Sequence, residues 1–293
     1  MNIQLQPISE RMGQQIDNSS CASILELDLL QIVNLFKNYG VLLFRGFEAD
    51  VDIFKKFSNS LSSDFMDYAG GAFVRRVINE DKTLLSVNDY QFEIKLHGEM
   101  YYQKNIPLLL WFFCANPAVK DGQTTICDGR EFYHEISSST KELFQQKKIK
   151  FTAHMPKEVW HQKYKTSDLK KLEEICITNN THLKIYEDCS ILLEYICPAI
   201  ITSRCGKHQV FINSLLPAKQ LNPNNIKFED GSEISDNIMS ELNEIAERIT
   251  TEISWQKGDI LMIDNTRILH GRRNFSDDKR DIYIRLCAPA FPF

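Results

Sequence analysis

The chain has 293 residues, 43% of them hydrophobic and 25% charged, a composition typical of soluble globular proteins and enough for one large domain or two small ones. A net charge of -5 and a pI near 5.9 argue against a surface built for nucleic acid, and no run of about 20 apolar residues that could span a membrane is present. The first residues lack the basic and apolar regions of a signal peptide and the cysteines form no CxxC pair, so we expect a cytoplasmic protein with reduced thiols.

Helices are predicted mainly near the start of the chain. Apolar residues at helical spacing predict a helix over 24–38, which Gly40 closes, and a second helix over 51–63. Between them the apolar run 40–46 is bounded by glycines and predicts a short buried strand.

The middle of the chain is richer in short strands. The peptide LLLWFFC at 108–114 is continuously apolar and short, which favours a buried strand over a helix. Gly122 interrupts the pattern before a second strand at 124–127, and residues 131–148 are predicted to form a helix.

Two polar stretches, 155–185 and 217–236, show weak periodicity and are interpreted as excursions from the core rather than as separate domains. A helix at 240–251 and two strands, 259–263 and 282–287, complete the chain. The pattern suits a single domain over 1–293 of the α+β class, mainly β, with a core like a sandwich or barrel.

The peptide LHGEMYY at 96–102 carries the first candidate for chemistry. In an extended strand, residues two apart point to the same face, so the His97 imidazole and the Glu99 carboxylate can converge on one point. Two imidazoles and one carboxylate form the facial triad of non-heme iron(II) oxygenases, which leaves metal positions open for a co-substrate and dioxygen. On its own, an HxE pair occurs by chance in many proteins.

A second peptide supplies the missing histidine. GDILMIDNTRILHGR at 258–272 predicts a strand and a turn, with His270 at the end of the turn. This peptide resembles the distal ligand motif of the TauD/TfdA (taurine dioxygenase) superfamily, in its clavaminate synthase-like branch. The proximal peptide LHGE, the following apolar strand, Gly-Gln-Thr at 122–124 and the early GVLLFRGF are also similar to that family.

The resemblance implies a double-stranded β-helix (jelly-roll) core with flanking helices, and a lid-like insertion around 155–185. It implies that His97, Glu99 and His270 bind Fe(II), and that 2-oxoglutarate and dioxygen are consumed while 2-oxoglutarate is converted into succinate and carbon dioxide.

The carboxylate of 2-oxoglutarate that lies away from the metal needs a cation, and the planar fork of arginine is its natural partner. The family places two arginines four apart on the last strand, whereas here Arg280 and Arg285 are five apart. A regular strand would point them to opposite faces and a bulge could bring both inward, so both stay candidates. Thr124 matches the family threonine that helps to bind the same carboxylate.

The leading functional hypothesis is hydroxylation of an unactivated carbon in a small polar substrate, such as an amino acid or its derivative, in natural-product biosynthesis. This substrate class rests on resemblance alone. Desaturation, oxidative decarboxylation and cyclisation use the same site, and a non-enzymatic 2-oxoglutarate sensor on the same fold is a further alternative. We expect no nucleic-acid or membrane partner, and the sequence leaves the oligomeric state open.

Overall fold

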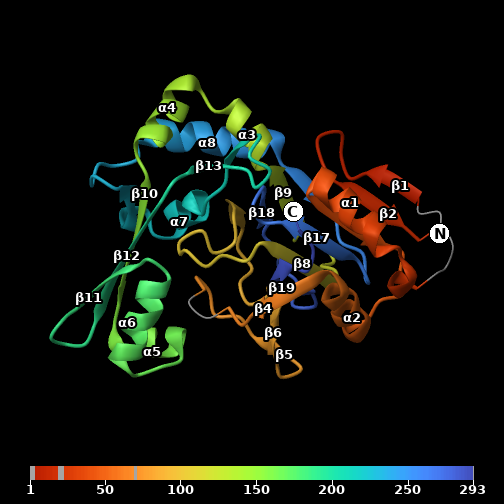
Figure 1. Ribbon diagram of the computed structural model, residues 1–293, viewed down its shortest axis with the longest axis horizontal. Helices are drawn as coiled ribbons and strands as arrows, with labels where there is room; N and C mark the ends of the chain where they lie inside the picture. The colour runs from red at the N-terminus through yellow and green to blue at the C-terminus, as the bar shows by residue number, and fades with distance from the viewer. Residues whose placement is uncertain (1–3, 19–22, 69–70, 293) are drawn as a thin grey trace.

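The computed structural model describes residues 4–18, 23–68 and 71–292. Two β-sheets pack on each other, and helices cover their outer faces (Figure 1). The larger sheet has the order β1-β2-β3-β17-β8-β19-β6-β5, with β4 paired to β19, and its strands are β1 (Gln4–Pro7), β2 (Gln14–Asp17), β3 (Val41–Arg45), β4 (Ser62–Met66), β5 (Val77–Ile78), β6 (Asp81–Ser86), β8 (Leu109–Asn116), β17 (Ile260–Asp264) and β19 (Asp281–Pro289). The smaller sheet has the order β16-β9-β18-β7, and its strands are β7 (Ile94–His97), β9 (Thr124–Asp128), β16 (Thr251–Ile253) and β18 (Ile268–Arg272).

The central strands of the larger sheet are apolar on both faces because both faces are covered. In β8, Phe112 lies in the core between the two sheets, whereas its neighbour Trp111 lies in the core under the helices. Those helices are α1 (Leu29–Tyr39) and α2 (Val51–Leu61). Burial on both sides explains why this strand reads as an unbroken apolar run rather than an alternating one.

The two longest predicted helices are each interrupted by a capping residue. The 24–38 prediction divides into a 3₁₀ turn, η1 (Ile24–Glu26), and α1, which begins after Asp28 and ends at Gly40 with a positive φ of 71°. Similarly, Ser137 caps a new helix within 131–148, so this region forms two helices. The helices over the smaller sheet are α3 (Gly129–Glu135), α4 (Ser138–Gln146), α7 (Leu215–Leu221) and α8 (Asp236–Ile249).

The polar stretch 155–185 folds around a small core of its own. It carries α5 (Lys157–Tyr164) and α6 (Leu169–Thr178), which project to one side of the two sheets (Figure 1). Trp160 and Leu172 from these helices pack against Leu193. The adjoining sheet has the order β11-β12-β10-β15, with strands β10 (Ile149–Met155), β11 (His182–Ile185), β12 (Ile191–Cys197) and β15 (Ile226–Phe228).

The second polar stretch, 217–236, is more regular than its sequence indicates. It contains most of α7, the short 3₁₀ helix η2 (Pro223–Asn225) and β15, and a separate hairpin of β13 (Ile200–Thr202) and β14 (Gln209–Phe211) lies just before it. Packing against the large cluster under α8 therefore overrides a composition typical of loops.

No helix in the described part of the chain combines the length and apolar character that crossing a bilayer would require. The seven described cysteines are free thiols, and Cys21 lies outside the described residues.

Candidate metal centre

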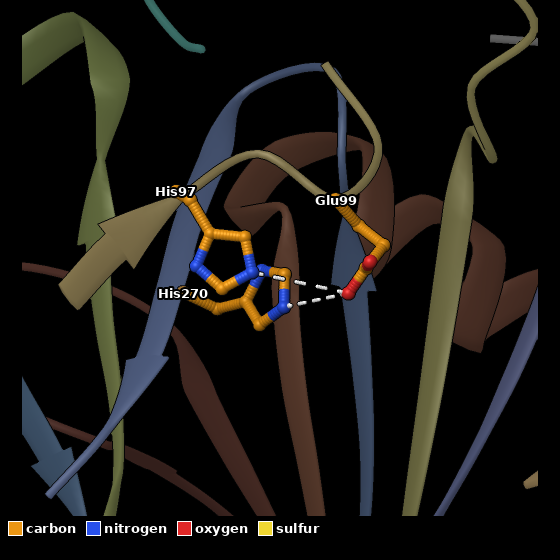
Figure 2. Close-up of side chains that lie close together, drawn as sticks. All are labelled: His97, Glu99 and His270. Atoms are coloured by element: carbon orange, nitrogen blue, oxygen red, sulfur yellow. Dashed lines mark ion pairs between the residues drawn. The ribbon is translucent and has the colours of Figure 1, made fainter. Parts of the chain in front are cut away.

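His97, Glu99 and His270 come together where β7 and β18 pair. His97 and His270 are directly opposite each other on these adjacent antiparallel strands. Figure 2 shows both imidazoles and the carboxylate pointing toward one another. Oε2 of Glu99 lies 3.5 Å from Nε2 of His270 and 3.9 Å from Nε2 of His97. Two residues separated only by Gly98 and a third from far along the chain thus present three ligand atoms to one point.

Glu99 reaches this point by a route that strand alternation did not predict. Strand β7 ends at His97, and Glu99 stands in the turn that follows. The turn requires glycine at position 98, since a Cβ there would lie 2.4 Å from Cδ2 of Tyr101 and 2.9 Å from Cγ1 of Ile212. The HxE pair therefore converges because of a tight turn and not because both residues share one face of a strand.

Asn265 holds the backbone of this turn. Its Oδ1 accepts a hydrogen bond from the Glu99 amide at 2.8 Å, and its Nδ2 donates to the carbonyl oxygens of Glu99 at 3.1 Å and Pro107 at 2.7 Å. Asn265 is fully buried in the turn between β17 and β18. The Asp-Asn dipeptide of the distal motif therefore fixes the position of the carboxylate as well as the turn before His270.

Hydrogen bonding also orients the first imidazole. Nδ1 of His97 lies 2.9 Å from the carbonyl oxygen of Lys95, so it is the protonated nitrogen and Nε2 keeps its lone pair for a metal. Burial, with His97 as a second cause, lowers the pKa of His270 to about 4. The lowered pKa keeps the His270 imidazole in the neutral form that metals bind.

A cation missed by sequence reasoning neutralises the carboxylate. Nη2 of Arg75 lies 3.0 Å from Oε2 of Glu99, and its guanidinium stacks 3.8 Å from the ring centroid of Tyr68. Burial alone would raise the pKa of Glu99, but Arg75 and the two histidines outweigh it and hold that pKa well below its usual range. Glu99 is therefore ionised although only 2% of its side chain is exposed.

The three residues fit a divalent metal ion. Their ligand atoms all lie within 4.8 Å of one another. Ligands about 2.1 Å from a metal and at right angles to one another would be about 3 Å apart, so small side-chain rotations would complete the site. The donor set of two imidazoles and one carboxylate is that of non-heme iron(II) oxygenases. All three residues also line one cavity of about 410 Å³, which gives small molecules access to the centre.

Two of the residues predicted to bind the co-substrate line this cavity. Arg280 is buried and donates from Nη1 to Oδ1 of Asn88 at 2.7 Å, while its Nη2 has no acceptor among the described residues. Thr124 begins β9, and its hydroxyl accepts a hydrogen bond from the indole of Trp255 at 3.0 Å. That bond leaves the hydroxyl hydrogen of Thr124 free to be donated to another group.

Arg285 lies on the other side of β19, away from the cavity. Its guanidinium donates to Oγ of Ser58 at 2.6 Å and to Oδ1 of Asn59 at 2.8 Å, and it stacks on Phe65. The register of β19 shifts between Asp281 and Ile282, but this irregularity does not turn Arg285 inward. The two arginines thus occupy opposite faces, as their odd spacing predicts for regular alternation.

Arg272, two residues after the distal histidine, closes one wall of the cavity. Its guanidinium donates to the carbonyl oxygens of Val87, Tyr90 and Phe92, so it fixes the segment that leads into β7. By contrast, Arg273 faces outward and pairs with three surface glutamates. The end of β18 and the residue after it therefore use the two arginines differently: Arg272 holds the cavity wall and Arg273 lies on the surface.

Comparisons with known proteins agree with this geometry. The sequence profile of the "Taurine catabolism dioxygenase TauD, TfdA family" matches residues 4–287. The chain is 22% identical to the dapdiamide synthesis protein DdaC of Enterobacter agglomerans, over 89% of this chain and 86% of that protein. It is 25% identical to a clavaminate synthase-like protein of Arabidopsis thaliana, over 87% of this chain and 83% of the relative.

Solved structures share the fold. PvcB of Pseudomonas aeruginosa superposes with a TM-score of 0.65 at 15% identity, covering 98% of this chain and 91% of PvcB. A second structure, described as PvcB, an Fe, alpha-ketoglutarate dependent oxygenase from an isonitrile synthetic pathway, has a TM-score of 0.63, 15% identity and the same coverage. AAD-2, solved with Mn(II) and N-oxalylglycine, has a TM-score of 0.61 at 12% identity, covering 100% of this chain and 99% of AAD-2.

The chain belongs to the TauD/TfdA family of dioxygenases. It is therefore an oxidoreductase that depends on Fe(II) and 2-oxoglutarate and uses dioxygen. The resemblance on which this expectation was based is confirmed over almost the whole chain.

Proposed function

We propose that the protein hydroxylates an unactivated C–H bond of a small polar substrate, an amino acid or a derivative of one, in the biosynthesis of a natural product. The observation that carries this proposal is a cavity of about 410 Å³ that the three metal-ligand candidates share with Thr124 and Arg280. A cavity of this size accommodates a co-substrate and a small second molecule together. Two relatives with names that refer to a synthesis protein and to a synthetic pathway support the biosynthetic assignment.

In this proposal His97, Glu99 and His270 hold the iron, and the protein leaves the remaining coordination positions free. When bound, the iron supplies the activation of dioxygen, coupled to conversion of 2-oxoglutarate into succinate and carbon dioxide. The chain's own contribution is to keep the ligands in place before the metal arrives. Asn265 fixes the Glu99 backbone, and the carbonyl of Lys95 fixes the His97 ring.

Arg280 and Thr124 are proposed to bind the carboxylate of 2-oxoglutarate that lies away from the metal. The unpaired Nη2 of Arg280 and the free hydroxyl hydrogen of Thr124 supply two donors in the same cavity. Burial, with neighbouring Arg272 as a second cause, lowers the pKa of Arg280, as expected for a cation that lacks a counter-ion. An arginine stays protonated at neutral pH, so an anionic ligand would supply the missing charge.

Neutral aromatic groups complete the wall beside the metal centre. Burial raises the pKa of Tyr68 to about 12 and raises that of Tyr102 well above its usual value, so both hydroxyls stay protonated. The hydroxyl of Tyr102 accepts a hydrogen bond from the Ala72 amide at 2.7 Å, which ties the segment that carries Arg75 to the turn after Glu99. A wall of this kind excludes water and offers the substrate no competing base.

We also propose that the two-sheet core is the double-stranded β-helix of the family, that residues 1–293 form one oxygenase domain, and that residues 155–185 cover its active site. The last point is supported by the lining of the cavity, to which α5 contributes Lys163 and Tyr164 and α6 contributes Ile175 and Cys176.

The test is a screen of free and carrier-bound amino acids for succinate release that depends on the added substrate, with product mass measured in parallel. We expect at least one candidate to gain the mass of one oxygen atom, with the His270→Ala variant as the inactive control. A product lighter than its substrate by two hydrogen atoms would indicate desaturation instead of hydroxylation. Tight binding of 2-oxoglutarate with no succinate formed with any candidate would favour a sensor instead.

A further inference from the structure

The cavity of the metal centre is lined by more cations than anions. Its described charged residues are the cations Arg75, Lys163, Arg272 and Arg280 and the carboxylates Asp89 and Glu99. An excess of positive charge in a partly desolvated cavity is costly unless ligands bring negative charge. One anionic ligand, 2-oxoglutarate, is already required by the family's chemistry. The remaining point is which cation of the cavity still lacks an anionic partner once 2-oxoglutarate is bound.

Three of the four cations have identifiable tasks. Arg272 donates to three backbone carbonyls, and Arg75 forms an ion pair with Glu99. Arg280 is held by Asn88 and is proposed to bind 2-oxoglutarate. Only Lys163 is left without a role.

Lys163 makes no hydrogen bond or ion pair with any residue that the structure describes. It stands near the end of α5, is half-buried and lines the cavity together with Tyr164 from α5 and Cys176 from α6. Burial is the sole cause that lowers the pKa of its ammonium, to about 8, and no carboxylate opposes that effect. At neutral pH the group is still mainly protonated, and it is a cation without a counter-ion.

The position of Lys163 separates it from the reacting centre. Helix α5 and strand β18, which carries His270, lie well apart in Figure 1, and the cavity is lined by residues of both. A ligand that reaches both sides must extend from the metal toward the 155–185 insertion.

We propose that Lys163 is a specificity-determining residue that binds a carboxylate on the substrate, at the end remote from the carbon that is oxidised. The substrate class is therefore an amino acid or a small amino-acid conjugate with an acidic group at its far end. This inference rests on the proposed function, because it assigns the substrate of that same site.

The test compares matched ligands that differ only in this charge. Amino acids and dipeptides that end in Glu or Asp are paired with their Gln or Asn twins. Each is titrated under argon into protein loaded with Fe(II) and 2-oxoglutarate, and binding is followed by calorimetry. In the wild type we expect at least one acidic ligand to bind roughly tenfold or more tightly than its amide twin, as one charge-assisted contact predicts.

The Lys163→Met variant should bind both members of such a pair equally, whereas Lys163→Arg should keep the preference. Lys170→Met is the matched control, because Lys170 is exposed on α6 of the same insertion and does not line the cavity. An unchanged preference in Lys163→Met, or no acidic preference in the wild type for any pair, would overturn the assignment.

Failure of the proposed function gives a different result. In that case the wild type would show no charge-transfer absorption with Fe(II) and 2-oxoglutarate, or no succinate formation with any candidate. Normal absorption and succinate formation without a role for Lys163 would leave the oxygenase assignment intact and remove only the acidic substrate.

Discussion

The substitution Arg280→Met should separate co-substrate binding from folding. Methionine keeps most of the length and apolar stem of arginine but removes the charge and all donors. If Arg280 binds the remote carboxylate of 2-oxoglutarate, the variant loses one charge-assisted interaction, which contributes about 1.5–3 kcal/mol. The dissociation constant for 2-oxoglutarate should then rise roughly 10- to 150-fold.

The structure indicates that this change costs little stability. Oδ1 of Asn88, the main acceptor for Arg280, still accepts from the Ile282 amide at 3.1 Å. The carbonyl of Val87 still accepts from Arg272. Because two of its three acceptors keep a donor, the free energy of unfolding should fall by only about 1 kcal/mol.

Arg285→Met is the matched control, because Arg285 lies on the face of β19 that points away from the cavity, whereas Arg280 directly precedes this strand and lines the cavity. It leaves Oδ1 of Asn59 without this donor, so it should destabilise the fold by about 1–3 kcal/mol and leave 2-oxoglutarate affinity unchanged. Affinity is measured by anaerobic titration of the charge-transfer absorption, and stability by urea unfolding. Weakened 2-oxoglutarate binding in Arg285→Met together with normal binding in Arg280→Met would refute the placement of the co-substrate.

Four further substitutions probe the metal centre. His97→Ala and His270→Ala should each abolish bound iron and succinate formation while the circular dichroism spectrum is kept; turnover in either would exclude that residue as a ligand. Asn265→Ala removes three hydrogen bonds and leaves the backbone of Glu99 unpaired, so we expect a loss of about 2–3 kcal/mol in unfolding free energy and weaker iron binding. Unchanged iron affinity would show that Asn265 does not position the carboxylate. Gly98→Ala forces a contact of 2.4 Å on the turn, so its iron content should fall at least tenfold, and full occupancy would contradict the need for glycine.

The parts of the fold predicted from the sequence are those governed by local pattern. All of the run at 108–114 except its first residue lies in β8, where its residues alternate between two covered faces. The motifs around His97 and His270 also predicted that these residues would meet, since a metal site restricts residue type and spacing more strongly than packing does.

The remaining features depend on contacts between distant segments. No pattern around Arg75 signals its ion pair with Glu99, because a loop brings it there. Strand alternation predicts that Arg280 and Arg285 point to opposite faces. It could not tell which of them lines the cavity, because the sequence does not show which face of β19 meets the cavity. The stretch 155–185 looked like a polar excursion because only a few of its residues form a core.

A metal ion bound by both His97 and His270, as proposed, would contribute to the stability of the protein as well as to its chemistry. Strand β7 is the outermost strand of the smaller sheet, and it meets β18 at these two residues. An ion bound by both residues would cross-link β7 to β18 at the edge of the sheet. Free metal at a concentration a hundred times its dissociation constant would add about 2.7 kcal/mol to the free energy of unfolding. Iron starvation would then slow catalysis and also loosen this edge, exposing unpaired backbone to proteases and to other strands.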